Sequence, residues 1–145
     1  MAEKKFELAS EEWFVELFRL FHEVARANPD LEFSVCEVFT AVPERLRPDS
    51  DGKIAWHGFI RGGKADLAMG EVGPEVVDVK TVIDWQSTLP LARMKIDLTD
   101  PQAFAHYMEL GDRLAAEGRM ERFGDRTKAP PALIGVHNTL ADRTA

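Results

Sequence analysis

The pattern of apolar and polar positions predicts a helix near the start of the chain. Ser10 is a good N-cap, and acidic residues follow it in the first turn, where they suit the helix dipole. Apolar residues recur at helical spacing at Trp13, Phe14, Leu17, Phe18, Leu20, Phe21 and Val24. Asn28-Pro29 ends the pattern. We expect a helix over residues 10–27 whose aromatic face belongs to the core; a face that docks another protein is the alternative interpretation.

The middle of the chain is rich in strand patterns. We expect strands over residues 33–42, 53–61, 64–72 and 76–84. In residues 33–42 both alternating sets are fairly apolar, so this strand should be covered on both faces. Cys36 is interpreted as a small core residue rather than a nucleophile, because no histidine lies near it in sequence.

The last of these strands separates its residues more clearly into two faces. Its buried set is Val77, Val79, Thr81 and Ile83, and its solvent-facing set is Asp78, Lys80 and Asp84. This alternation predicts one buried and one wet face for the strand.

Gly62-Gly63 predicts a two-residue hairpin turn with positive φ. Such a turn pairs Ile60 with Ala65, Gly58 with Leu67 and Trp56 with Met69 on one apolar face. It places His57 with Ala68, and Phe59 with Asp66, on the other face. The gap at Gly58 leaves room beside Trp56 for a ligand or for a helix side chain.

The C-terminal third contains a short helical crossing at residues 85–93, a helix over 101–117 and a strand over 119–123. Gly124-Asp125 then turns the chain into a closing helix over residues 131–142. The closing helix is apolar on one side, at Leu133, Val136, His137 and Leu140. That side must cover the sheet, so we expect an α+β fold in which helices cover a mostly antiparallel five-stranded sheet, in one domain over residues 1–145.

The charge of the chain argues against one class of partner. A net charge of −7 argues against a nucleic-acid partner, because binding phosphates requires a basic surface. Basic residues do cluster near the C-terminus, at Arg119, Arg122, Arg126 and Lys128. We interpret this cluster as a solvated rim rather than an anion site.

The chain is expected to be soluble and cytoplasmic. Its single cysteine cannot form an internal disulfide, so nothing requires an oxidising compartment. The first residues lack the apolar region of a signal peptide, and no apolar run is long enough for stable insertion into a membrane.

Candidate catalytic groups are few. His57 with Asp66 or Asp84 would make a general base if both pointed into an apolar cavity, as in a small isomerase or hydratase. His106 and Glu109 are three residues apart on one helix but lack further ligands, so no metal site is expected. The chain shows no nucleophile elbow, phosphate loop or dinucleotide fingerprint. We therefore expect no cofactor, and we favour a binding protein over an enzyme.

From about Trp56 to Leu140 the chain resembles the sterol carrier protein family of lipid-binding domains. The resemblance lies in the order of its parts, which are a hairpin, the strand Val-Asp-Val-Lys-Thr-Val at 77–82, a short crossing, Gly118-Arg119-Met120, and Gly124-Asp125 before a final helix. The helix at 98–117 departs from the family, in which the crossing is short, and is placed to reshape or cover the mouth of a tunnel.

The family implies an α+β fold with helices on one side of the sheet and an apolar tunnel for fatty acyl chains, sterols or similar lipids. It has no universal catalytic residues to carry over. Our leading hypothesis is a carrier of a small apolar ligand or lipid, with a homodimer left open. The walls of its hydrophobic cavity would come from Trp56, Trp85, Phe104, Met108, Met120, Phe123, Leu133, Val136 and Leu140.

Overall fold

A computed structural model describes residues 4–145 as one sheet with helices packed on it. The strands are β1 (Phe33–Thr40), β2 (Ile54–Arg61), β3 (Lys64–Met69), β4 (Val79–Asp84) and β5 (Met120–Gly124). The α-helices are α1 (Glu11–Ala27), α2 (Trp85–Arg93), α3 (Pro101–Ala116) and α4 (Ala132–Asp142). Two short 3-10 turns, η1 (Glu44–Leu46) and η2 (Arg126–Lys128), follow β1 and β5.

The sheet has the strand order β3-β2-β1-β4-β5. All neighbouring strands are antiparallel except β1 and β4, which run parallel at the centre of the sheet. The predicted α+β fold with a mostly antiparallel five-stranded sheet is therefore confirmed. The predicted strands also form, although four of them are shorter than expected, because end residues of the ranges 33–42, 53–61, 64–72 and 76–84 lie outside the strands.

The hairpin between β2 and β3 has the predicted register. Gly62 and Gly63 have φ angles of 60° and 77°, which the tight turn requires. Trp56 pairs with Met69, and Gly58 pairs with Leu67. A Cβ atom at Gly58 would lie 2.4 Å from the Leu67 side chain. The space expected beside Trp56 is thus occupied by the Leu67 side chain of the neighbouring strand.

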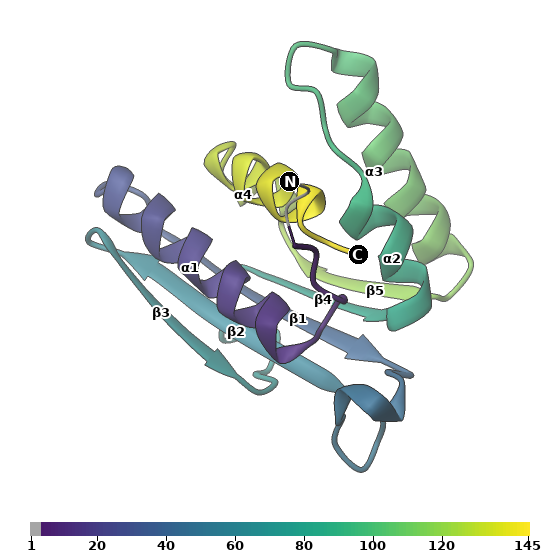
Figure 1. Ribbon diagram of the computed structural model, residues 1–145. Coiled ribbons are helices and arrows are strands. Elements are labelled where there is room, and N and C mark those ends of the chain that lie inside the picture. Colours follow the sequence, from purple (N-terminus) through teal and green to yellow (C-terminus); the bar gives the residue numbers. More distant parts are fainter. Residues whose placement is uncertain (1–3) are drawn as a thin grey trace.

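The helices all lie on one face of the sheet (Figure 1). Helix α1 packs over β3, α2 over β1 and β4, and α3 over β5, while α4 lies beside α1 and α2. The aromatic face of α1 belongs to the core, as predicted: Trp13 lies 6.1 Å from Phe39, and Phe21 lies 5.2 Å from Trp56, measured between ring centroids. Of the large apolar residues on α1, Val15 is the exposed one, at 65%. The helix therefore offers no contiguous apolar patch for docking a partner.

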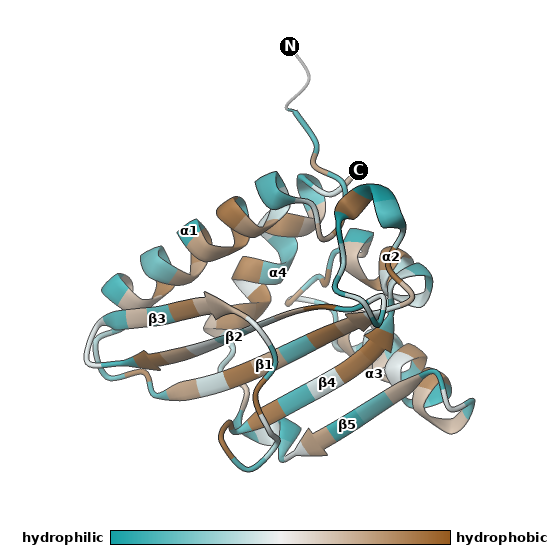
Figure 2. Cartoon of the chain, turned by 90° about the horizontal axis from the view of Figure 1, so that it is seen from below, coloured by the Kyte–Doolittle hydropathy of each residue, from teal (hydrophilic) through white to brown (hydrophobic). Residues whose placement is uncertain are grey.

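The opposite face of the sheet is partly covered by the connection between β3 and β4, which crosses it (Figure 2). Val72 and Val77 of this connection pack with Cys36 and Val38 of β1. The two-sided burial expected for β1 is confirmed, and Cys36 is fully buried. Burial raises the pKa of the Cys36 thiol, which favours its neutral, unreactive form.

Three positions differ from the expected strand faces. Val77 lies before β4 and packs on the outer face, rather than in the inner set with Val79. Lys80 is buried rather than wet, because its amino group forms a 2.7 Å ion pair with Glu71. Val42, which alternation predicts on the same face as Cys36 and Val38, lies past the end of β1, where Ala41 has a φ of 49°, and it joins the inner core. The loop between β3 and β4 contains Glu71, the partner of Lys80, and Val72, which packs in the same cluster as Val77. The alternation within a single strand does not predict these contacts.

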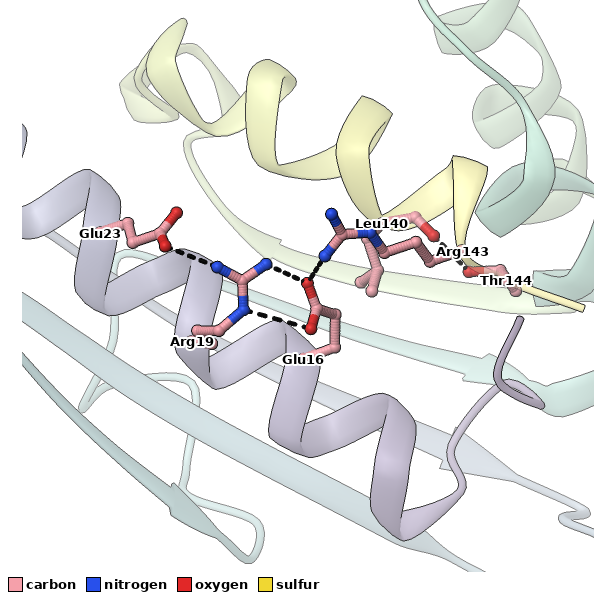
Figure 3. Close-up of polar contacts among 6 residues, drawn as sticks. All are labelled: Glu16, Arg19, Glu23, Leu140, Arg143 and Thr144. Carbon is pink, nitrogen blue, oxygen red and sulfur yellow. Dashed lines mark hydrogen bonds and ion pairs between the residues drawn. The ribbon is translucent and has the colours of Figure 1, made fainter. Parts of the chain in front are cut away.

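The two ends of the chain lie together and tie α1 to α4. The backbone nitrogen of Phe6 donates to the oxygen of Arg143, and that of Ala145 donates back to Phe6. The Glu16 carboxylate accepts hydrogen bonds from both Arg19 and Arg143, as Figure 3 shows. These contacts hold α1 and α4 against each other.

Candidate functional site

A cavity of about 270 Å³ lies between the sheet and the helices. Its apolar wall consists of Leu8, Trp13, Leu17, Phe21, Phe33, Val35, Phe39, Trp56, Val79, Ile83, Leu91, Ala92, Met120, Ala129, Leu133, Val136 and Leu140. The volume lies just below the range of about 300–1,000 Å³ that is usual for small-molecule pockets. The cavity therefore suits one small or slender apolar molecule.

The periodicities of the sequence explain how these residues meet. Alternate residues of β1, from Phe33 to Phe39, point to the helical side, and Val79, Thr81 and Ile83 do the same in β4. In α1 the lining residues are spaced by four, at Trp13, Leu17 and Phe21. Helix α4 covers the cavity from the far side, so its apolar face meets the cavity rather than packing tightly on the strands.

Five of the nine residues proposed as cavity walls line this cavity: Trp56, Met120, Leu133, Val136 and Leu140. They come from β2, β5 and α4, which are distant in sequence. The closing helix thus contributes the side that its periodicity predicted.

The other four lie elsewhere. Trp85 packs at the edge of the core, and its indole nitrogen donates a 2.9 Å hydrogen bond to the oxygen of Leu8. Phe104 is 43% exposed on α3, and Met108 borders a separate cavity of about 20 Å³. Phe123 is paired with Lys80, so it lies on the outer face of the sheet. For Phe123 the strand was predicted correctly, but nothing local identified which of its faces the helices cover.

Polar side chains also enter the cavity, and none of them was among the nine residues proposed as cavity walls. They are Glu37, Thr81, Thr88, Tyr107, Arg126 and His137. Glu37 carried a usable signal, because it interrupts the apolar set formed by Phe33, Val35 and Phe39. An acid at such a position lies on a buried face. Arg126 was assigned to a solvated rim, and this was wrong, because η2 turns its side chain to the cavity.

Glu37 is at the centre of the inner face. It is paired directly with Trp56 on β2 and with Thr81 on β4. Burial raises the pKa of the Glu37 carboxyl group, while the nearby Trp56 indole and the positive charge of Arg126 act in the opposite direction. The side chain nevertheless keeps part of its surface open to the cavity.

Tyr107 and Arg126 face Glu37 from α3 and η2. Burial lowers the pKa of the Arg126 guanidinium, and the neighbouring Arg122 lowers it further, while Tyr107 and Glu37 oppose this shift. Burial, followed by the charge of Glu37, raises the pKa of the Tyr107 hydroxyl. Arg122 itself is paired with Asp112 at 2.8 Å. Within residues 4–145, no ion pair of 4.0 Å or less joins Arg126 to a carboxylate.

His137 fixes the upper wall. Its Nε2 donates a 2.6 Å hydrogen bond to the oxygen of Met94, and its ring contacts Tyr107 edge-on at 5.2 Å between centroids. Burial lowers the pKa of this imidazole, which favours its neutral form, while the hydrogen bond to Met94 opposes the shift. The sequence predicted His137 on the apolar side of the closing helix, and from that helix it lines the cavity.

The alternative catalytic pair lies away from the cavity. His57 and Asp66 are on the outer face of the sheet, and the His57 ring bonds through Nδ1 to the oxygen of Gly70. Asp84 caps the first turn of α2 through Ser87. The pair therefore lacks the apolar cavity that its proposed chemistry requires. In residues 4–145 no cluster of three or more His, Cys, Asp or Glu side chains is arranged to hold a metal ion.

None of the helices among the described residues is long and apolar enough to cross a bilayer. Neither a protein-family model nor a curated protein sequence matches the chain.

Solved structures do match. Sterol carrier protein 2 matches over 96% of this chain and 100% of its own, with 16% identity and a TM-score of 0.52. A protein from Thermus thermophilus, named as possibly a sterol carrier protein, matches over 96% of this chain and 93% of its own, with 17% identity and a TM-score of 0.48. The sec-alkylsulfatase Pisa1 from Pseudomonas sp. is 18% identical with a TM-score of 0.45; the match covers 89% of this chain but 15% of the sulfatase. The chain has the fold of sterol carrier protein 2.

Proposed function

We propose that this protein binds and carries a small apolar ligand, of lipid or fatty acyl type, in the cavity between the sheet and the helices. The observation that carries the proposal is the cavity itself, because about 270 Å³ of space remains beneath α1, α2 and α4 with a mostly aliphatic and aromatic wall. Protein interiors are usually packed without voids of this size. The likeness in fold to a protein named sterol carrier protein 2 supports the same function.

Burial of apolar surface would supply most of the affinity. Each Å² removed from water contributes about 25 cal/mol, so a ligand that fills the cavity gains more than one that occupies only its mouth. Affinity should therefore rise with chain length until the cavity is full and then level off.

Displacement of a fluorescent probe tests the proposal. The delipidated protein is titrated with N-phenyl-1-naphthylamine, a neutral apolar dye, and competitors of increasing chain length are then added. Val136→Phe places a ring in the cavity and should abolish dye binding, whereas Val15→Phe on the exposed side of α1 should not change it. If wild-type protein binds neither the dye nor any competitor, or if both variants behave alike, the proposal fails.

A further inference from the structure

The Glu37 carboxyl group lies in the wall of a mostly apolar cavity. Glu37 has no hydrogen bond or ion pair to a described residue that satisfies ordinary geometry, although it lies on the central strand of the sheet. Burying such a group costs free energy unless a partner is supplied. The surface that it keeps open faces the cavity, so a bound molecule can supply the partner.

The groups around Glu37 support this role for a ligand. The Trp56 side chain is 1% exposed, and its Nε1 has no hydrogen-bond partner, although its N–H lies near the Glu37 carboxyl group. The indole nitrogen is completely covered, so a ligand reaches Glu37 and not the indole. The covered indole lies beside the carboxyl group, and the surface that the carboxyl group keeps open faces the cavity.

Hydrogen-bond donors, one of them a cation, face Glu37 across the cavity. Arg126 and Tyr107 come from η2 and α3, and both lie within electrostatic range of the carboxyl group. Because no ion pair closes the space between Glu37 and Arg126, an oxygen-bearing group of a ligand can lie between them. It would face an acceptor on the sheet and donors on the opposite wall.

Given the apolar ligand proposed above, we infer that Glu37 and Arg126 select an apolar molecule that carries a hydroxyl group. A hydroxyl group donates one hydrogen bond and accepts others, so it donates to Glu37 and accepts from Arg126 at the same time. It also suits Glu37 in either protonation state, since a neutral carboxyl group still accepts. An ester cannot donate, and a carboxylate would place a second acid beside Glu37. An alkylammonium would bring a second cation close to Arg126.

A set of competitors that share an unbranched ten-carbon chain tests the inference: decanol, methyl decanoate, decanoate and decylamine. Each displaces N-phenyl-1-naphthylamine from wild-type protein, Glu37→Leu, Glu37→Gln and a control variant. Glu121→Leu is the control, because it replaces an exposed acid on the outer face of β5. Wild-type protein and the control should prefer decanol to methyl decanoate by about tenfold, the effect of one hydrogen bond to a charged group.

Glu37→Leu should lose this preference while still binding methyl decanoate and the dye. Glu37→Gln should keep part of it, because an amide both donates and accepts. Equal binding of all competitors by wild-type protein, or a preference for decanoate, would overturn the inference yet leave the carrier function intact. Failure of wild-type protein to bind any competitor or the dye would instead overturn the carrier function. A decanol preference that survives in Glu37→Leu would show that another group recognises the hydroxyl.

Discussion

The indole nitrogen of Trp13 donates a 3.1 Å hydrogen bond to the hydroxyl oxygen of Thr144, across 131 positions of the sequence. Thr144 is 2% exposed, and its hydroxyl group donates in turn to the oxygen of Leu140 at 2.7 Å. The contact joins the start of α1 to the end of the chain. It ties α1 to the residues that follow α4, and side chains of both helices line the cavity.

Replacing Thr144 with valine should therefore destabilise the protein although the shape of the side chain is kept. The indole N–H would remain buried without a partner, which costs about 1–3 kcal/mol. Urea denaturation followed by tryptophan fluorescence measures the change in the free energy of unfolding. Thr144→Ser is the control, since it retains the hydroxyl group. In a double-mutant cycle with Trp13→Phe the two effects should not add; additive effects would contradict a direct contact.

The Glu16 carboxylate should stabilise the protein only above acidic pH. Its hydrogen bond from Arg19, opposed by burial and reinforced by Arg143, holds its pKa below the ordinary value of 4.5. A carboxyl group whose pKa falls on folding adds stability above its unfolded pKa, and this stability is lost as the pH drops through the folded pKa. We expect Glu16→Gln to cost about 1 kcal/mol at pH 7 and almost nothing well below pH 4.5. A cost that does not change between these conditions would contradict this charge-based account.

Gly124→Ala should disrupt the connection that carries Arg126 to the cavity. Gly124 has a φ of 90°, and a Cβ atom there would lie 1.9 Å from the backbone oxygen of Asp78. The strained backbone alone costs about 1–2 kcal/mol, and the clash adds to it. Gly118→Ala is a matched control, because its φ is 74° but no atom lies within 4 Å of the added carbon. Thermal unfolding should show a larger loss of stability for Gly124→Ala than for Gly118→Ala. Equal losses of stability would mean that the backbone at Asp78 moves away from the added carbon without cost.

Leu140→Ala should cost less than an ordinary core truncation. Removing a packed leucine side chain costs about 2–5 kcal/mol, but Leu140 already borders empty space. Leu20→Ala is the control, because Leu20 is buried and does not line the cavity. When denaturation is measured in the presence of decanol as a ligand, Leu140→Ala should also lose part of the stabilisation that a bound ligand gives the folded state. The cavity interpretation would be contradicted if Leu140→Ala lost as much stability as Leu20→Ala without ligand and if apolar ligands did not stabilise wild-type protein. Helix α4 would then be an ordinary part of the core.

His57→Ala should leave apolar-ligand binding unchanged. His57 lies on the outer face of the sheet, where its ring contacts Phe59 and the oxygen of Gly70. Dye displacement checks the binding, and circular dichroism checks that the hairpin remains folded. A variant that folds but no longer binds would show that the outer face communicates with the cavity.

The sequence by itself determined the local elements. Ser10 and Asn28 set the ends of α1, and Gly62-Gly63 fixed the register of the hairpin through its turn geometry. The apolar side of α4 was also readable, because helical spacing places Leu133, Val136 and Leu140 together. In each case the controlling interaction lies within a few residues of sequence.

The tertiary structure alone decided which faces meet at the cavity. Periodicity gives the spacing of a strand's two faces but not which one the helices cover, so Phe123 was assigned to the wrong side. Glu37, Tyr107 and Arg126 come together only because the chain returns to place β4 beside β1 and then folds η2 back over the sheet. These are contacts between segments far apart in sequence, and no local pattern specifies them.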